Sequence, residues 1–131
     1  MLYTKCIFLP VERSDGTRIS VMSRHTLEDG VTPDHRIAPT LYKEWRKEFA
    51  PPDTLVGDYY KRGLPWPEFE KRYLAHLRTP EVGIKVISLA KRAAVEDITL
   101  LCAEETPEHC HRRLLAEECQ RYETRLKVQH R

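Results

Sequence analysis

Side chains with catalytic chemistry gather near the C-terminal end of the chain, at Cys102, Glu104, Cys110, His111 and Arg112. A thiolate can act as a nucleophile, an imidazole as a base, a carboxylate as an acid or orienting group, and a guanidinium as an anion clamp. We therefore predict that Cys110, His111 and Glu104 are catalytic residues. Arg112 is a predicted anion-binding residue. Cysteine also packs as a small apolar side chain, so either thiol can instead belong to the core.

The sequence predicts a strand, a turn and a helix around these side chains. Ile98–Ala103 is apolar at both alternating sets of positions, which is typical of a strand covered on both faces in a parallel sheet. Thr106 can cap a helix, and Pro107 fits the first helical position because it has no amide hydrogen. We expect the helix to run from about Pro107 to Tyr122. Its unpaired amides would favour anions and thiolates, so Thr106 is also a predicted anion-binding residue.

A metal or thiol redox site is the alternative use of the same residue types. Cys102, Cys110 and His109 offer two sulfur ligands and one nitrogen ligand, a set that suits zinc. Seven residues separate the two cysteines, whereas zinc sites that are recognisable in a sequence use short Cys-x-x-Cys pairs. The metal hypothesis therefore ranks below the thiol nucleophile. The chain has no glycine-rich phosphate loop, and no cofactor follows from the sequence.

The segment Cys102–Ala116 reads Cys-Ala-Glu-Glu-Thr-Pro-Glu-His-Cys-His-Arg-Arg-Leu-Leu-Ala. It resembles the C-terminal signature of the domain-of-unknown-function family 488, in which a strand ends in cysteine and an acidic turn leads to Cys-His-Arg at the last helix. The resemblance implies a small α/β fold and no particular reaction. It also implies that the signature positions are held here by Cys102, Glu104, Cys110, His111 and Arg112.

Similarity to this family extends over most of the chain. It includes the N-terminal strand with its Asp15-Gly16 turn, the segment Lys47–Pro52 and the segment Phe69–Leu74. One branch of the family has an Asp-Arg-Leu-Trp-Pro-Arg-Gly run after its second strand, whereas this chain has Met22–Glu28 at that place. We therefore expect no role here that depends on the acid of that run.

The composition predicts one domain that spans residues 1–131. The chain is 40% hydrophobic and 32% charged, with a formal net charge of +2, which is too small to require a nucleic-acid partner. No apolar stretch is long enough to cross a membrane, and the N-terminus lacks a signal-peptide pattern. We expect a cytoplasmic protein without a membrane partner, whose four cysteines are thiols rather than disulfides.

The rest of the chain predicts two strands and then a series of helices. Leu2–Leu9 and Arg18–Ser23 have the composition of strands, and the turn between them favours a hairpin. Apolar spacing then predicts helices over residues 40–50, 55–63, 66–77 and 82–93. Residues 125–129 are expected to form a short last strand or a frayed end.

Arg24–Pro39 lacks periodicity and is expected to be a long loop, a kind of segment that is often functional. If the strand before it runs parallel to Ile98–Ala103, the loop starts on the same side of the sheet as the predicted site. Arg24 or His25 would then lie near Cys110. Arg24 is therefore the third predicted anion-binding residue.

These patterns predict a small three-layer α/β domain with a short, mostly parallel or mixed central sheet flanked by helices. The favoured function is an enzyme or binding protein for a small anionic ligand, either phosphorylated or nucleotide-like. Basic and aromatic residues also alternate in Tyr59–Arg62 and Lys71–Tyr73, as on some nucleic-acid-binding surfaces. Helical spacing explains these aromatics as core residues, so a nucleic-acid-associated role is the third hypothesis. The sequence carries no signal for an oligomeric state.

Overall fold

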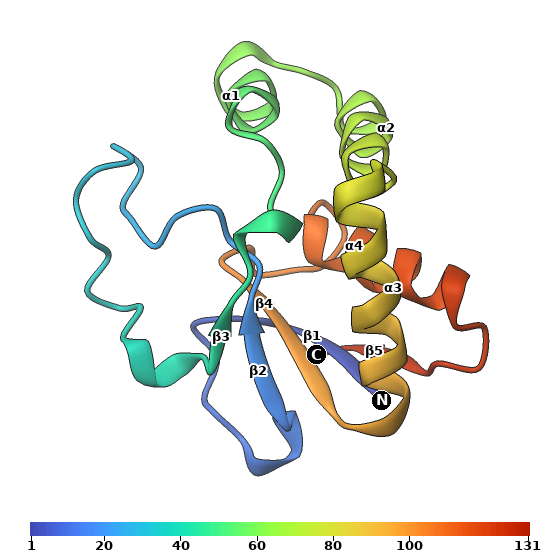
Figure 1. Ribbon diagram of the computed structural model, residues 1–131. Helices are drawn as coiled ribbons and strands as arrows, with labels where there is room; N and C mark the ends of the chain where they lie inside the picture. Colours follow the sequence, from blue (N-terminus) through green and yellow to red (C-terminus); the bar gives the residue numbers. More distant parts are fainter.

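The computed structural model describes residues 1–131 and has a five-stranded sheet at its centre (Figure 1). The strands lie in the order β3-β2-β4-β1-β5, and every neighbouring pair is parallel. β4 occupies the middle and all its residues are buried, as its unbroken apolar sequence predicts. The predicted small α/β fold is confirmed, and its sheet is wholly parallel. The strands are β1 (Leu2–Cys6), β2 (Thr17–Ser20), β3 (Glu44–Trp45), β4 (Ile98–Cys102) and β5 (Val128–His130).

The predicted hairpin between the first two strands is wrong. β1 and β2 lie on opposite sides of β4 and each pairs with it in parallel. The Asp15-Gly16 pair serves a different purpose from a hairpin turn. Gly16 has φ 63°, and a Cβ atom there would lie 2.2 Å from the Asp97 carbonyl oxygen. Only glycine fits this close approach, which lets β2 begin beside the residue that precedes β4.

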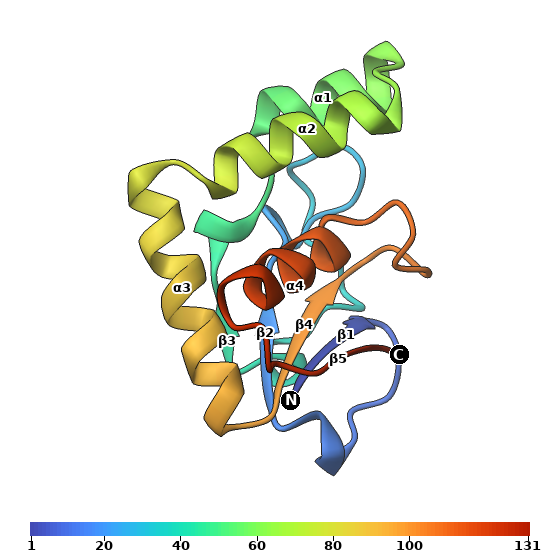
Figure 2. The ribbon, with the colours of Figure 1, turned by 90° about the vertical axis from the view of Figure 1, so that its right-hand side faces the viewer.

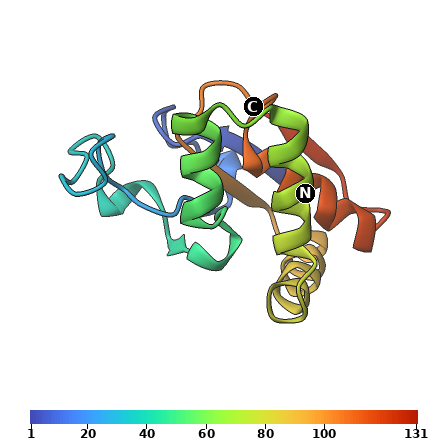
Figure 3. The ribbon, with the colours of Figure 1, turned by 90° about the horizontal axis from the view of Figure 1, so that it is seen from above.

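All four α-helices cover one face of the sheet or its upper end. The connections from β3 to β4 and from β4 to β5 cross the sheet in the same direction, so right-handed crossovers place both on the same face. α4 lies directly against this face, beside α3 (Figure 2). α1 and α2 lie side by side above the carboxyl ends of the strands (Figures 1 and 3). The helices are α1 (Asp53–Arg62), α2 (Trp66–Leu77), α3 (Pro80–Val95) and α4 (His111–Tyr122).

The main core fills the space between the sheet and these helices. Leu2, Ile19 and Leu100 point into it from three adjacent strands, and Leu77, Val86 and Leu114 are among the helical residues that meet them. On the other face a smaller cluster joins Ile7, Ile37 and Leu101. The connections from β1 to β2 and from β2 to β3 run the opposite way across the sheet and cover this face with irregular chain. The third layer is therefore built of loops and 3-10 turns, and α-helices flank one face only.

The helix predicted over residues 40–50 is also wrong. This segment forms a 3-10 turn (Pro39–Leu41), strand β3 and a second 3-10 turn (Lys47–Phe49). The amides of Lys43 and Arg46 donate to the carbonyls of Arg18 and Ser20 on β2. A helix over residues 40–50 would lose these hydrogen bonds to the edge of β2. The segment therefore pairs with β2, although its apolar side chains are spaced four residues apart as in a helix. The helices predicted over residues 55–63, 66–77 and 82–93 are confirmed, and the last segment forms the short strand β5 rather than a frayed end. None of the helices has both the length and the apolar character that crossing a bilayer requires.

Candidate functional site

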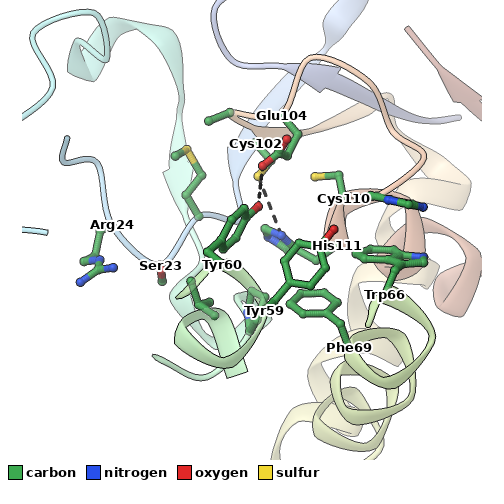
Figure 4. A pocket seen from close by; sticks show the side chains of 15 residues that line it. Ser23, Arg24, Tyr59, Tyr60, Trp66, Phe69, Cys102, Glu104, Cys110 and His111 are labelled. Carbon is green, nitrogen blue, oxygen red and sulfur yellow. Dashed lines mark hydrogen bonds between the residues drawn. The ribbon is translucent and has the colours of Figure 1, made fainter. Parts of the chain in front are cut away.

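A cavity of ≈ 140 Å³ lies where β4 ends, between the segment that follows β4 and the helices α1 and α2 (Figure 4). Parallel sheets commonly bind ligands at the carboxyl ends of their strands, and this cavity has that position. Fifteen residues line it, and nine of them are hydrophobic. They include Arg24 and Glu104, the aromatic side chains of Tyr59, Tyr60, Trp66 and Phe69, and the group Cys102, Cys110 and His111, which we call the thiol cluster.

Within the thiol cluster, Cys102 Sγ lies 3.8 Å from His111 Nδ1. The other ring nitrogen, Nε2, lies 2.8 Å from the Val21 carbonyl oxygen. A carbonyl oxygen can only accept, so Nε2 carries a hydrogen and donates it. In the neutral ring Nδ1 is therefore unprotonated, with its lone pair directed at the Cys102 sulfur. This arrangement can receive the thiol proton of Cys102 or bind a metal ion.

The segment before α4 brings His111 beside Cys102. The predicted helix start at Thr106 and Pro107 is wrong. α4 begins at His111, after turns that span the preceding residues. Arg113 donates to the Pro107 and Glu108 carbonyls, and Arg112 donates to the Glu104 carbonyl at 2.7 Å. The Arg113 guanidinium therefore bonds to the Pro107 and Glu108 carbonyls, which a helix starting at Pro107 would use for its own backbone hydrogen bonds. Thr106 caps no helix; it is exposed and does not line the cavity.

The two thiols of the cluster are shifted in opposite directions. A hydrogen bond with the Cys110 thiol, helped by the Glu104 backbone amide and the Arg112 charge, holds the pKa of Cys102 below its ordinary value despite burial. Burial raises the pKa of Cys110 well above its ordinary value. The sequence pointed to Cys110 as the ionised thiol. The surroundings in the structure favour ionisation of Cys102 instead.

Arg112 is fully buried and lies outside the residues that line the cavity. Its Nη1 donates to the Glu104 carbonyl and lies 3.3 Å from Cys110 Sγ, whereas its Nε and Nη2 atoms have no partner. No carboxylate forms an ion pair with it. In this position it holds the segment after β4 in place beside the thiol cluster. Its predicted role as an anion clamp stays a prediction.

Glu104 and Tyr60 meet at the opening of the cavity. The Tyr60 hydroxyl donates to Glu104 Oε1, which joins α1 to the segment after β4 (Figure 4). Partial desolvation at the cavity mouth and the hydrogen bond to the Glu104 carboxylate raise the pKa of Tyr60, so the phenol stays protonated and acts as a donor. Glu104 is thus fixed by a tyrosine that lies 44 positions earlier in the chain.

Aromatic side chains form one wall of the cavity. Trp66 stacks on Phe69 at 5.0 Å between ring centroids, and Tyr59 packs against both rings. His109, which the sequence placed with the cysteines as a metal ligand, stacks instead on Trp66 at 4.6 Å. The third ligand-type side chain beside the two cysteines is His111.

The loop after β2 reaches the cavity through Arg24. This exposed guanidinium lines the cavity and also a neighbouring groove, at some distance from the cysteines (Figure 4). His25 does not line the cavity; it bonds to the Ser20 hydroxyl and stacks on Trp45 at 3.8 Å. Because β2 runs parallel to β4, the loop emerges at the same end of the sheet as the thiol cluster, as expected.

Sequence reasoning assigned the aromatic residues of α1 and α2 to the core and missed their part in the cavity. One signal was present in the sequence. Tyr59 and Tyr60 are adjacent, and neighbouring residues on a helix cannot both face the same core. In the structure Tyr59 packs on the aromatic wall, while Tyr60 turns towards Glu104.

Comparisons with known proteins agree with the signature around the thiol cluster. The family model DUF488-N3a, described as "Active DUF488-N3 subclade", matches residues 2–123. Searches of curated proteins and of solved structures gave no match. The matched range contains β1 to β4, all four α-helices and every residue that lines the cavity. The chain therefore belongs to the DUF488 family.

Proposed function

We propose that this protein is an enzyme that acts on a small nucleotide-like anion, with Cys102 as the nucleophile and His111 as its base. The observation that carries the proposal is the 3.8 Å approach of Cys102 Sγ to His111 Nδ1 in the cavity wall. A cysteine beside a base that a third group orients is the usual arrangement of an activated thiol. Here the Val21 carbonyl is the orienting group. The description of the family branch as active agrees with a catalytic role.

The chemical step follows from this arrangement. Nδ1 of His111 takes the proton of the Cys102 thiol as the sulfur forms a bond to an electrophilic centre of the substrate. The leaving group departs with the electron pair of the broken bond. Protonated His111, or a water molecule at the cavity mouth, can then return a proton to it. Glu104, held by Tyr60, would orient the polar edge of the substrate.

Two features of the cavity support a nucleotide-like substrate. Tyr59, Trp66 and Phe69 give the cavity an aromatic lining against which a planar ring can pack, and Trp66 itself already stacks on Phe69 and His109. Arg24 lines the cavity and forms no ion pair within the protein, so its guanidinium is free to bind a phosphate. The proposal therefore places the ring against the aromatic wall and the anionic group at Arg24.

Alkylation rates test the nucleophile directly. The protein is treated briefly with iodoacetamide at neutral pH, and labelling of each cysteine is followed by mass spectrometry. Cys102 is expected to react first, and Cys6 is the matched control because their exposed fractions are 7% and 5%. Replacing His111 with glutamine should slow the labelling of Cys102 and leave that of Cys6 unchanged. Equal slow labelling of both thiols would contradict the proposal.

Thermal protection tests the ligand class. Nucleotides should raise the melting temperature more than inorganic phosphate or a free base alone, because only they engage the aromatic wall and Arg24 together. Arg24→Gln should reduce protection by nucleotides. Arg36→Gln is the control, because Arg36 is paired with Asp34 in the same loop and lies outside the cavity. An equal loss of protection in both variants would argue against a specific contact at Arg24.

A further inference from the structure

The thiol cluster has the composition and spacing of a metal site. Cys102 Sγ, Cys110 Sγ and one nitrogen of His111 all lie within 4.8 Å of one another, and all three residues are buried. Two sulfurs and an imidazole nitrogen are ligands that Zn²⁺ prefers over harder cations such as Mg²⁺. We infer that Cys102, Cys110 and His111 bind a single Zn²⁺ ion, with the fourth coordination position open to the cavity.

The distances are close to those that a tetrahedral ion needs. Bonds of about 2.3 Å to sulfur and about 2.0–2.1 Å to nitrogen place those two ligands roughly 3.6 Å apart. Cys102 Sγ and His111 Nδ1 are already 3.8 Å apart. No pair in the cluster exceeds 4.8 Å, so side-chain adjustments of about 1 Å or less complete the set. The backbone of β4 and α4 need not move.

The groups around the ligands also suit an ion. The Nε2 hydrogen of His111 is donated to the Val21 carbonyl, which fixes the ring and leaves Nδ1 for the metal, a common second contact of metal-binding histidines. Arg112 lies 3.3 Å from Cys110 Sγ and can stabilise that sulfur as a thiolate once its proton is released. Two thiolates would then balance the ion, and the Arg112 charge would remain beside them.

The fourth position distinguishes this site from a closed structural one. Only three ligand-type side chains meet here, and all three line the cavity. Zinc sites with three protein ligands keep an open position for water or substrate, whereas structural sites usually have four protein ligands. His109 does not supply a fourth ligand in this structure, because its ring stacks on Trp66.

Zinc binding and the nucleophilic role of Cys102 would exclude each other. The ion would use the same sulfur lone pair and the same Nδ1 atom, so Zn²⁺ would block alkylation of Cys102. This regulatory consequence rests on the proposed function, whereas ion binding itself does not. Zn²⁺ would then be a reversible inhibitor of the Cys102 nucleophile, and a chelator would restore its reactivity.

The experiment uses the full chain after treatment with a chelator and a reducing agent. Zn²⁺ is titrated against a chromophoric chelator, and Co²⁺ is bound to the wild type as a spectroscopic probe. We expect one ion per chain. The cobalt complex should show the visible bands of a tetrahedral ion and the charge-transfer band of cobalt bound to thiolate. Absence of both bands and of zinc binding would overturn the inference without any variant.

Variants then assign the ligands. Cys110→Ala should weaken zinc binding by more than about 100-fold, since loss of a direct ligand exceeds the 10- to 100-fold effect of a second contact. Cys119→Ala is the matched control, because Cys119 is equally buried on α4 but its sulfur contacts the Val86 carbonyl. His111→Gln should weaken binding like Cys110→Ala, and His109→Gln should not. Equal losses in Cys119→Ala or His109→Gln would overturn the assignment.

Alkylation with and without Zn²⁺ separates the two proposals. Protection of Cys102 by zinc, with fast labelling after chelation, supports both. If the protein binds no added Zn²⁺ and Cys102 is labelled fast, the metal site is overturned and the nucleophile stands. Tight zinc binding with slow labelling of the metal-free protein would overturn the nucleophile and leave the metal site.

Discussion

Two buried polar clusters lie in this protein, and they are balanced in different ways. On the face of the sheet opposite the helices, the Asp15 carboxylate contacts Lys5 Nζ at 3.1 Å, Arg18 Nη1 at 2.6 Å and Arg131 Nη1 at 2.9 Å. We call these four residues the Asp15 cluster. The thiol cluster at the carboxyl end of β4 has no carboxylate among its members, and the buried Arg112 beside it has no ion-pair partner.

This difference indicates that the Asp15 cluster stabilises the fold, whereas the thiol cluster is available for chemistry. The Asp15 cluster brings opposite charges into direct contact, and Asp15 itself is 0% exposed and lines no major cavity. All three cations bind the one Asp15 carboxylate, and Lys5 also lies 3.7 Å from Glu12. The thiol cluster opens into a cavity, and its sulfur and nitrogen lone pairs have few partners. Buried polar groups of the first kind hold a fold together, while those of the second kind are available to a ligand or ion.

The largest effect is expected from Asp15→Asn. This change keeps the shape of the side chain but leaves Arg18 buried without a counter-charge and Lys5 with Glu12 alone, 3.7 Å away. Breaking such a buried pair costs about 3–5 kcal/mol of the free energy of unfolding. Urea unfolding monitored by circular dichroism measures the loss. The labelling rate of Cys102 in the folded fraction should stay unchanged, because the two clusters lie on different sides of β4; a slower rate would mean that the clusters are coupled.

The Asp15 carboxylate should also make the free energy of unfolding depend on pH in the acid range. Burial alone would raise the pKa of Asp15, but the Glu12 amide, Lys5 and Arg18 together hold it below the ordinary value of 3.8. A depressed pKa contributes stability that is complete above the unfolded-state value and is lost as the pH falls through the folded-state value. The wild type should therefore lose stability below about pH 4 more steeply than Asp15→Asn. Parallel pH profiles for the two proteins would show that Asp15 is not the group responsible.

Arg112→Lys is expected to have a medium effect. Lysine keeps the charge but cannot reproduce the planar contact with the Glu104 carbonyl and the Cys110 sulfur. We expect a loss of about 1–3 kcal/mol in the free energy of unfolding, the usual cost of leaving a buried polar group unsatisfied. Arg113→Lys should cost less, because the Arg113 side chain is 22% exposed and also pairs with Glu117. An unchanged stability with weaker protection by phosphate would instead support the anion role predicted from the sequence.

The smallest effect on stability is expected from Tyr60→Phe. The Tyr60 hydroxyl bonds to Glu104 at the exposed mouth of the cavity, so its loss should change the free energy of unfolding by less than about 1 kcal/mol. Protection by nucleotides should nevertheless fall, because Glu104 loses the donor that orients it. Tyr122→Phe is the control, since Tyr122 lies outside the cavity. Equal nucleotide protection in wild type and Tyr60→Phe would remove Glu104 from the ligand-binding groups.

The fold was predictable where local sequence and long-range pairing agree. Ile98–Cys102 forms the buried central strand because its apolar residues suit either face of a parallel sheet. α2 and α3 follow their apolar spacing and begin near a proline. Prediction failed where pairing partners decide the outcome. β3 lies within residues 40–50, whose apolar side chains have helical spacing, and pairing with the edge of β2 makes it a strand instead.

The candidate site was predictable in its central residues and not in its walls. Cys102, Cys110 and His111 are close in the chain, and the sequence placed Cys102 at the end of a strand and the other two near the start of the following helix. Tyr60 and Trp66 come from helices more than 30 positions away, and nothing in their local sequence shows which residues they face. The same limit applied to Arg112. Its residue type suggested an anion clamp, but burial under the segment after β4 could be seen only in three dimensions.

The central position of β4 has a consequence for how the chain acquires its structure during synthesis. β1 and β2 pair with β4 and not with each other, and Leu2 is matched with Ile98 near the far end of the chain. Contacts so distant in sequence form slowly, because a long loop must close before any of them is gained. On a ribosome that makes protein from the N-terminus, the first strand therefore waits unpaired until residues 98–102 have emerged. The apolar side chains of β1, Leu2 among them, therefore stay exposed to solvent for that interval.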